Sequence, residues 1–108
     1  MKRYCLTLSL RNDPELIQQY EEHHKAVWPE IIRSIKDAGI ESMEIFRHGT
    51  SLFMIIDVND EFSFEKKQQA DAKNQKVQEW EELMWKYQEP WTGGEKWMLM
   101  NKIFKLTE

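Results

Sequence analysis

The chain has 108 residues, of which 41% are hydrophobic and 31% are charged, and its formal net charge at pH 7 is −4. These values are typical of one globular domain, residues 1–108, because domains usually hold about 100–150 residues. No stripe of Lys and Arg stands out, and no apolar run approaches the ~20 residues that span a bilayer. We therefore expect neither a nucleic-acid partner nor a membrane partner.

The first residues and the single cysteine bear on the compartment. A short basic tip at Lys2 and Arg3 is followed by alternating polar residues, which do not form the apolar core of a signal peptide. Cys5 is the single cysteine, which excludes an intramolecular disulfide and a cysteine-rich metal site. We expect a cytoplasmic protein.

The first third of the chain predicts a strand and an interrupted helix. Residues 3–10 alternate between apolar and polar side chains, which is the pattern of a half-buried strand. Asp13 is a suitable helix cap, and Pro14 suits the first helical position, where a missing N–H costs nothing. Pro29 removes a backbone hydrogen bond, so the helix should kink or restart there. Gly39 then ends the helix.

The rest of the chain predicts a hairpin, two helical segments and a last strand. Residues 41–48 and 51–58 are strand-like runs joined by a glycine-bearing turn. A short helix to about Ala72 follows, and a stronger helix is predicted over residues 74–88. Residues 96–106 alternate again and predict a strand that carries apolar side chains on both faces.

The order β-α-β-β-α-β predicts an α+β fold of the ferredoxin-like class. In this fold a four-stranded antiparallel sheet is covered by helices on one face. The other face would expose a large apolar patch in so small a domain, and a second copy of the chain is its simplest cover. We therefore expect a homodimer of the dimeric α/β-barrel type.

Three side chains of the first helix are candidates for chemistry. Tyr20, His24 and Trp28 are spaced by four, so a helix places them one above another on a single face. A histidine between a phenol and an indole is a suitable proton shuttle, with a pKa near neutrality. Aromatic and histidine side chains on an apolar stripe also serve as core packing, and the residues alone leave both interpretations open.

The other histidines predict no metal centre. His23 is adjacent to His24, so the two side chains diverge on a helix, and we expect His23 in solvent. His48 stands beside a turn glycine and is expected to be exposed. The chain has neither an H-x-x-x-H nor an H-E-x-x-H spacing, so we expect no metal.

The string Tyr20-x-x-x-His24-x-x-x-Trp28-Pro29-Glu30, after a strand and an Asp-Pro helix start, resembles the L-rhamnose mutarotase family. The resemblance covers nearly the whole chain in element order and length. It implies that His24 is the catalytic acid/base and that Tyr20 is an active-site residue. It also implies a monosaccharide as the small-molecule partner.

In that family two neighbouring tryptophans of the later helix line the sugar pocket. The matching positions here are Trp80 and Glu81, so one tryptophan carries over and a hydrogen-bond acceptor replaces the other. We expect Trp28, Trp80 and Glu81 to bind the substrate. Trp80 also lies on an apolar helix stripe, which leaves a purely structural role open.

The resemblance predicts an isomerase that interconverts the α and β anomers of a 6-deoxy-L-hexose by acid/base ring opening. L-rhamnose is the first candidate, and L-fucose follows closely because Glu81 replaces a stacking surface. The reaction needs no cofactor, which agrees with a sequence that has no glycine-rich phosphate loop. Two alternatives stay open: a cofactor-independent monooxygenase or haem-degrading enzyme of the same fold, and a non-catalytic dimeric binding module.

Overall fold

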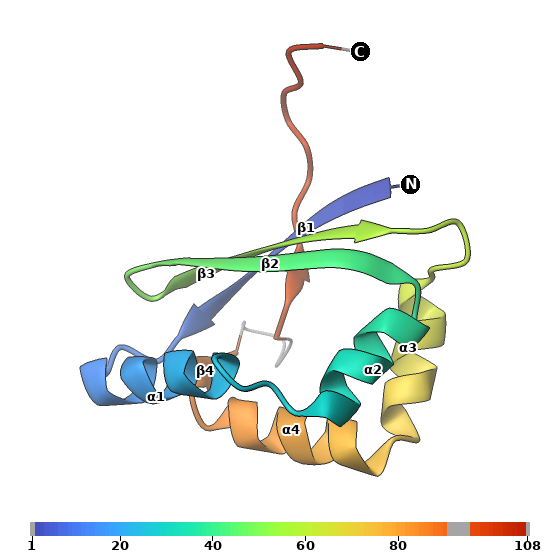
Figure 1. Ribbon diagram of the computed structural model, residues 1–108. Helices are drawn as coiled ribbons and strands as arrows, with labels where there is room; N and C mark the ends of the chain where they lie inside the picture. The colour runs from blue at the N-terminus through green and yellow to red at the C-terminus, as the bar shows by residue number, and fades with distance from the viewer. Residues whose placement is uncertain (1, 91–95, 108) are drawn as a thin grey trace.

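The computed structural model describes residues 2–90 and 96–107, and Figure 1 shows how their elements are arranged. In chain order these residues form β1 (Lys2–Leu10), α1 (Pro14–His24), α2 (Pro29–Asp37), β2 (Ile40–His48), β3 (Ser51–Val58), α3 (Phe64–Ala72), α4 (Gln75–Trp85), β4 (Gln88–Glu89) and β5 (Met98–Leu99). The helices lie together on one face of the antiparallel sheet, which confirms the predicted α+β, ferredoxin-like fold. None of the described helices is long and apolar enough to cross a membrane.

Over residues 2–90 and 96–107 the sheet has five strands where four were predicted. Its order is β2-β3-β1-β4, and β5 also pairs with β1. The two short strands share one side of β1: β4 pairs with Ser9 and Leu10, and β5 pairs with Leu6 and Thr7. The fifth strand therefore arises because two short segments divide the place expected for one.

The predicted boundaries are wrong in two places near the C-terminus. The helix expected over residues 74–88 ends at Trp85, and Gln88 already belongs to a strand. The strand expected over residues 96–106 is limited to Met98–Leu99, and the amide of Met100 makes a further bond of 2.8 Å to the Cys5 carbonyl. Beyond it the chain leaves the sheet on the face opposite the helices, so its alternating residues pair with no strand in the part of the chain that the structure describes (Figure 1).

The N-terminal helices follow their sequence signals. The Asp13 carboxylate accepts the backbone N–H groups of Glu15 and Leu16 at 3.0 and 3.3 Å, which caps α1 next to Pro14. The predicted interruption is a full break, because α1 ends at His24 and α2 starts at Pro29. The loop between them allows α2 to run in a different direction (Figure 1).

The alternation of β1 separates the two faces of the sheet. Leu6, Leu8 and Leu10 are buried beneath the helices, as the period-two pattern predicted. Around them the main core contains residues from α1, α2 and α4, from β3 and from the turn after α4: Tyr20, Ile31, Leu52, Val77, Trp80, Met84 and Tyr87. The burial of these side chains is the main force that holds the helices on the sheet.

Gly39 ends the α2 segment with a positive φ of 99°, as predicted for a glycine that follows a helix. A Cβ at this position would lie 2.5 Å from Oδ1 of Asn59, whose backbone N–H bonds the Gly39 carbonyl at 2.9 Å. Gly49 also has a positive φ, of 59°, but no atom of the described residues lies within 4 Å of a Cβ there. A side chain would therefore meet a steric conflict at Gly39, whereas at Gly49 it would meet only the cost of a left-handed backbone.

We expect Gly39→Ala to lower the free energy of unfolding by about 2–4 kcal/mol, because it combines an unfavourable φ with a clash. Gly49→Ala is the matched control and should cost only about 1 kcal/mol, since it carries the φ penalty alone. Urea unfolding followed by tryptophan fluorescence measures both values. Equal losses in the two variants would show that the contact with Asn59 does not matter.

Candidate active site

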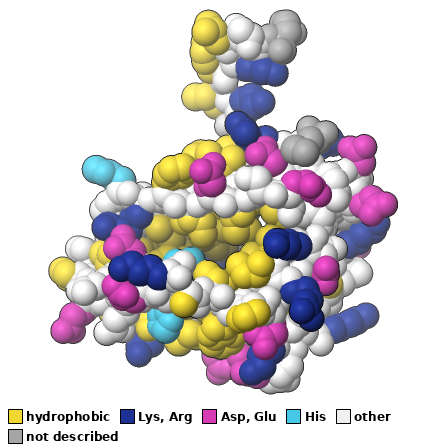
Figure 2. All heavy atoms as spheres, in the orientation of Figure 1, with side chains coloured by type: hydrophobic (Ala, Val, Ile, Leu, Met, Phe, Trp, Pro, Cys, Tyr) yellow, Lys and Arg dark blue, Asp and Glu magenta, His cyan; other side chains and the backbone are white. Residues whose placement is uncertain are grey.

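A cavity of about 710 Å³ opens between the sheet and the helices, and Figure 2 shows this hollow with a mainly hydrophobic wall. Strand side chains such as Leu6, Ile45 and Met54 form one wall, and Trp80 and Met84 of α4 belong to the opposite one. The size is within the range of about 300–1,000 Å³ that small-molecule sites occupy. A few polar groups reach this apolar space, and they determine its chemistry.

His24 lines the cavity from the last turn of α1. Its Nδ1 lies 2.8 Å from the backbone carbonyl oxygen of Tyr20. Because a carbonyl oxygen only accepts hydrogen bonds, Nδ1 carries the proton and Nε2 keeps its lone pair. Burial lowers the pKa of His24. The hydrogen bond to the Tyr20 carbonyl opposes this lowering, and the charge of His23 adds to it. The ring is therefore neutral at pH 7 and is available as a base.

Tyr20 lies one helical turn before His24, with its ring centroid 4.4 Å from the imidazole. The side chain is buried but lines the cavity. Burial raises the pKa of the Tyr20 phenol, and the Gln88 side chain opposes this shift as a hydrogen-bond partner. The phenol therefore keeps its proton at neutral pH and can donate a hydrogen bond to a ligand.

The two predicted tryptophans occupy different places. Trp80 lines the cavity, with its ring 5.7 Å from that of His24 in an edge-to-face arrangement. Trp28 does not belong to the lining but packs edge-on against Trp80 at 5.1 Å. Trp28 thus supports the tryptophan that faces the cavity. A pair held in this way presents a fixed aromatic surface.

Glu81 and Lys96 lie on the same wall. Glu81 is half-buried and lines the cavity, so the structure brings it together with Tyr20, His24 and Trp80. The Lys96 amino group donates to the Glu81 carbonyl at 3.1 Å and lies 4.5 Å from the Trp85 ring centroid. Burial lowers the pKa of Lys96, and the negative charge of Glu81 opposes that shift.

Sequence reasoning missed Lys96 and Gln88 as cavity residues. Lys96 is remote in sequence from the helical motif, and only the pairing of β5 with β1 places it near α4. Gln88 was predicted to lie in a helix, where its side chain would follow a different periodicity. One signal for Gln88 was present in the sequence. The apolar stripe of the helix ends at Tyr87, and the polar Gln88 follows directly, where the chain is still buried.

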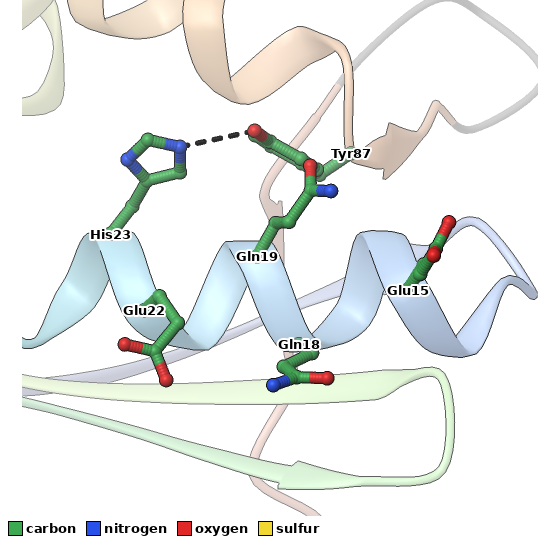
Figure 3. Close-up of a pocket in the computed structure, with 6 residues that line it drawn as sticks. All are labelled: Glu15, Gln18, Gln19, Glu22, His23 and Tyr87. Atoms are coloured by element: carbon green, nitrogen blue, oxygen red, sulfur yellow. Dashed lines mark hydrogen bonds between the residues drawn. The ribbon is translucent and has the colours of Figure 1, made fainter.

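The prediction that His23 lies in solvent is wrong. His23 is half-buried, and its Nε2 lies 3.0 Å from the hydroxyl of Tyr87. Figure 3 shows these two side chains pointing toward one another across a shallow groove beside α1, which is separate in its lining from the cavity of His24. The pair connects α1 to the segment after α4. His48, by contrast, is exposed, as predicted.

Sequence and structure comparisons identify the family. The family profile described as L-rhamnose mutarotase matches residues 3–106. The chain belongs to the L-rhamnose mutarotase family. It is 42% identical to an L-fucose mutarotase of Xanthomonas campestris pv. campestris over 100% of this chain and 90% of that protein. It is 30% identical to an L-rhamnose mutarotase of Oceanobacillus iheyensis, over 71% of this chain and 68% of that protein.

The fold agrees with this membership. The crystal structure of an L-rhamnose mutarotase from Formosa agariphila superposes with a TM-score of 0.74, covering 99% of this chain and 100% of that chain at 21% identity. The chain is therefore a sugar isomerase of the mutarotase family, and the monooxygenase, haem-degrading and non-catalytic alternatives are not favoured.

The lowered pKa of His24 predicts how stability depends on pH. In the unfolded chain the imidazole takes up a proton near its ordinary pKa of 6.5, whereas burial resists protonation in the folded chain. The contribution of His24 to the free energy of unfolding is therefore fully present above pH 6.5. It is lost as the pH falls through the lower pKa of the folded chain.

We expect the free energy of unfolding to fall below pH 6.5 and this fall to become smaller in His24→Gln. Urea unfolding at a series of pH values from about 7.5 to about 5 tests this. His48→Gln, which changes an exposed imidazole, is the matched control. If both variants keep the wild-type dependence of the unfolding free energy on pH, burial of His24 does not control that dependence.

Proposed function

We propose that this protein is a mutarotase that interconverts the α and β anomers of a 6-deoxy-L-hexose through the open-chain aldehyde. The observation that carries the proposal is the neutral imidazole of His24, held by the Tyr20 carbonyl at 2.8 Å beside an apolar cavity. A neutral imidazole fixed in one tautomer is a suitable general base. Membership of the mutarotase family supports the same assignment.

In the proposed reaction Nε2 of His24 takes the proton from the anomeric hydroxyl, while a second group protonates the ring oxygen. The bond between the anomeric carbon and the ring oxygen then breaks and leaves an aldehyde and a hydroxyl. Rotation about the neighbouring carbon–carbon bond and closure with the proton transfers reversed give the other anomer. General acid–base catalysis of this kind contributes about 10²–10⁴-fold.

The other cavity residues have distinct proposed roles. The Tyr20 hydroxyl donates a hydrogen bond to a sugar oxygen, since burial keeps this phenol protonated. Trp80 packs against the apolar side of the pyranose, and Trp28 holds that indole in place. Glu81 and Lys96, which share one wall, are the candidates for the second proton carrier.

L-fucose is the first candidate substrate and L-rhamnose the second. The relative named as an L-fucose mutarotase matches the whole chain at 42% identity, whereas the L-rhamnose mutarotase of Oceanobacillus iheyensis matches less of it at 30%. Glu81 supports this order, because a carboxylate beside Trp80 adds a hydrogen-bond acceptor to the wall. The strand wall of the cavity is apolar and suits the methyl group of either sugar.

We also propose a cytoplasmic homodimer in which a second copy covers the open sheet face. Phe46 is 52% exposed on that face and pairs across the strands with Phe53. The C-terminal tail leaves the body on the same side with Ile103, Phe104 and Leu106 largely exposed (Figure 1). Apolar side chains placed in this way gain most by packing on a second, identical sheet face.

Replacing His24 by Ala should lower the rate of anomer exchange of L-fucose by about 10²–10⁴-fold, because the general base is lost. Exchange is measured by saturation-difference NMR between the two anomeric protons. Tyr20→Phe should lose less activity, since it removes one hydrogen bond, and His48→Ala is the control for an exposed histidine. Full exchange in His24→Ala would remove this residue from the mechanism.

Replacement of apolar tail side chains by charged ones should weaken the proposed dimer. We expect the double variant Ile103→Glu and Phe104→Glu to shift the chain from dimer to monomer in sedimentation velocity, because both side chains would lose apolar contact with the second copy. Lys102→Glu and Lys105→Glu together place the same two carboxylates on neighbouring exposed positions as a control. A wild-type monomer at all concentrations, or a dimer unaffected by the apolar replacements, contradicts the proposed interface.

A further inference from the structure

Among the described residues, Gln88 alone is both polar and buried. The residue is 3% exposed, lies at the start of β4 and lines the cavity that contains Tyr20 and His24. Its carbonyl oxygen, Oε1, is buried and has no hydrogen-bond partner among the described residues. The main-chain position does not explain the side chain, because the pairing of Gln88 with Leu10 in the sheet uses backbone groups.

A buried carbonyl oxygen without a partner opposes folding, because it has lost its hydrogen bonds to water and gained none in return. Leu or Met has a similar volume and would not carry this cost, and Met84 of the core already lines the same cavity with an apolar side chain. An unpaired group of this kind is explained when a ligand supplies the missing hydrogen bond.

The chemistry of the amide matches a sugar hydroxyl. A primary amide is neutral, accepts through its oxygen and donates through its NH₂ group, and a hydroxyl can act as the partner of either. The terminal torsion of glutamine has a broad energy profile, so the amide can turn to present either group to the cavity. Gln88 and Tyr20 line the same cavity, and the Gln88 side chain opposes the rise in the pKa of the Tyr20 phenol, so the cavity holds two neutral polar groups.

We propose that Gln88 is a substrate-binding residue that recognises one hydroxyl of the sugar and so determines which sugars the enzyme accepts. The inference rests on the proposed mutarotase function. The amide is paired by the substrate in the complex, and a sugar that lacks this hydroxyl leaves it unpaired. Sites built to bind a hydroxyl reject analogues without it far more strongly than apolar pockets reject an added group.

The first experiment compares stability with kinetics in Gln88→Leu and Gln88→Met. We expect the melting temperature to be unchanged or higher, since the unpaired oxygen is gone, while KM for L-fucose or L-rhamnose rises by about tenfold or more. The value of kcat should fall less than KM rises, because His24 is untouched. Gln68→Leu, an exposed residue of α3, is the control.

The second experiment identifies the hydroxyl with wild-type protein and deoxy analogues of the accepted sugar. At one ring position, removal of the hydroxyl should cost wild type about tenfold or more in kcat/KM and cost Gln88→Leu little. At all other positions the two losses should be additive. This pattern is one that a merely structural role of Gln88 would not produce.

The outcomes separate this inference from the function on which it rests. Wild-type protein that accelerates anomer exchange of no 6-deoxy-L-hexose overturns both. Wild-type activity together with an unchanged KM in the Gln88 variants overturns the role of Gln88 alone, as does additivity at every hydroxyl. A lowered melting temperature in both Leu and Met variants, without a change in KM, assigns Gln88 to packing.

Discussion

The packing of one face of β1 against the helices is the constraint on which the structure depends. This strand pairs with β3 on one side and with both β4 and β5 on the other, and its alternate leucines lie beneath the helices. A shift of one residue in its register would expose all of these leucines at once. The same packing fixes the distance between the sheet and the helices, and the cavity occupies part of that space.

Within the cavity, position in the helix determines the state of each polar group. Tyr20 and His24 are one turn apart, so the carbonyl of the first residue is within reach of the imidazole of the second. Backbone geometry that every helix possesses therefore selects the tautomer, and burial keeps both side chains neutral. Among the described residues, the proposed base is therefore oriented by a neutral backbone carbonyl and not by a charged group.

The local signals of the sequence predicted most of the fold. Alternation in β1, the Asp13 cap and the glycine before β2 each act through neighbouring residues, and the structure confirms all three. The C-terminal strand was mistaken because alternation reports which side chains are apolar and not whether a partner strand is present. Pairing ends after Met100, and only tertiary structure determines where.

The sequence predicted only part of the candidate site, because local patterns do not show which distant segments meet. Helical spacing brought Tyr20 and His24 together correctly, and both line one cavity. Gln88 and Lys96 come from segments distant in sequence, and their approach to α1 and α4 depends on how β4 and β5 divide the side of β1. Those two positions required the fold.

The break between α1 and α2 has an electrostatic consequence. Because the chain stops being helical at His24, this imidazole lies in the last turn, where peptide carbonyls without helical partners carry partial negative charge. An uncharged ring gains nothing from that end of the helix dipole, but an imidazolium formed during proton transfer is stabilised by it. In the proposed reaction the interruption near Pro29 would thus favour the short-lived cation over the resting state, which is the differential stabilisation that lowers a barrier.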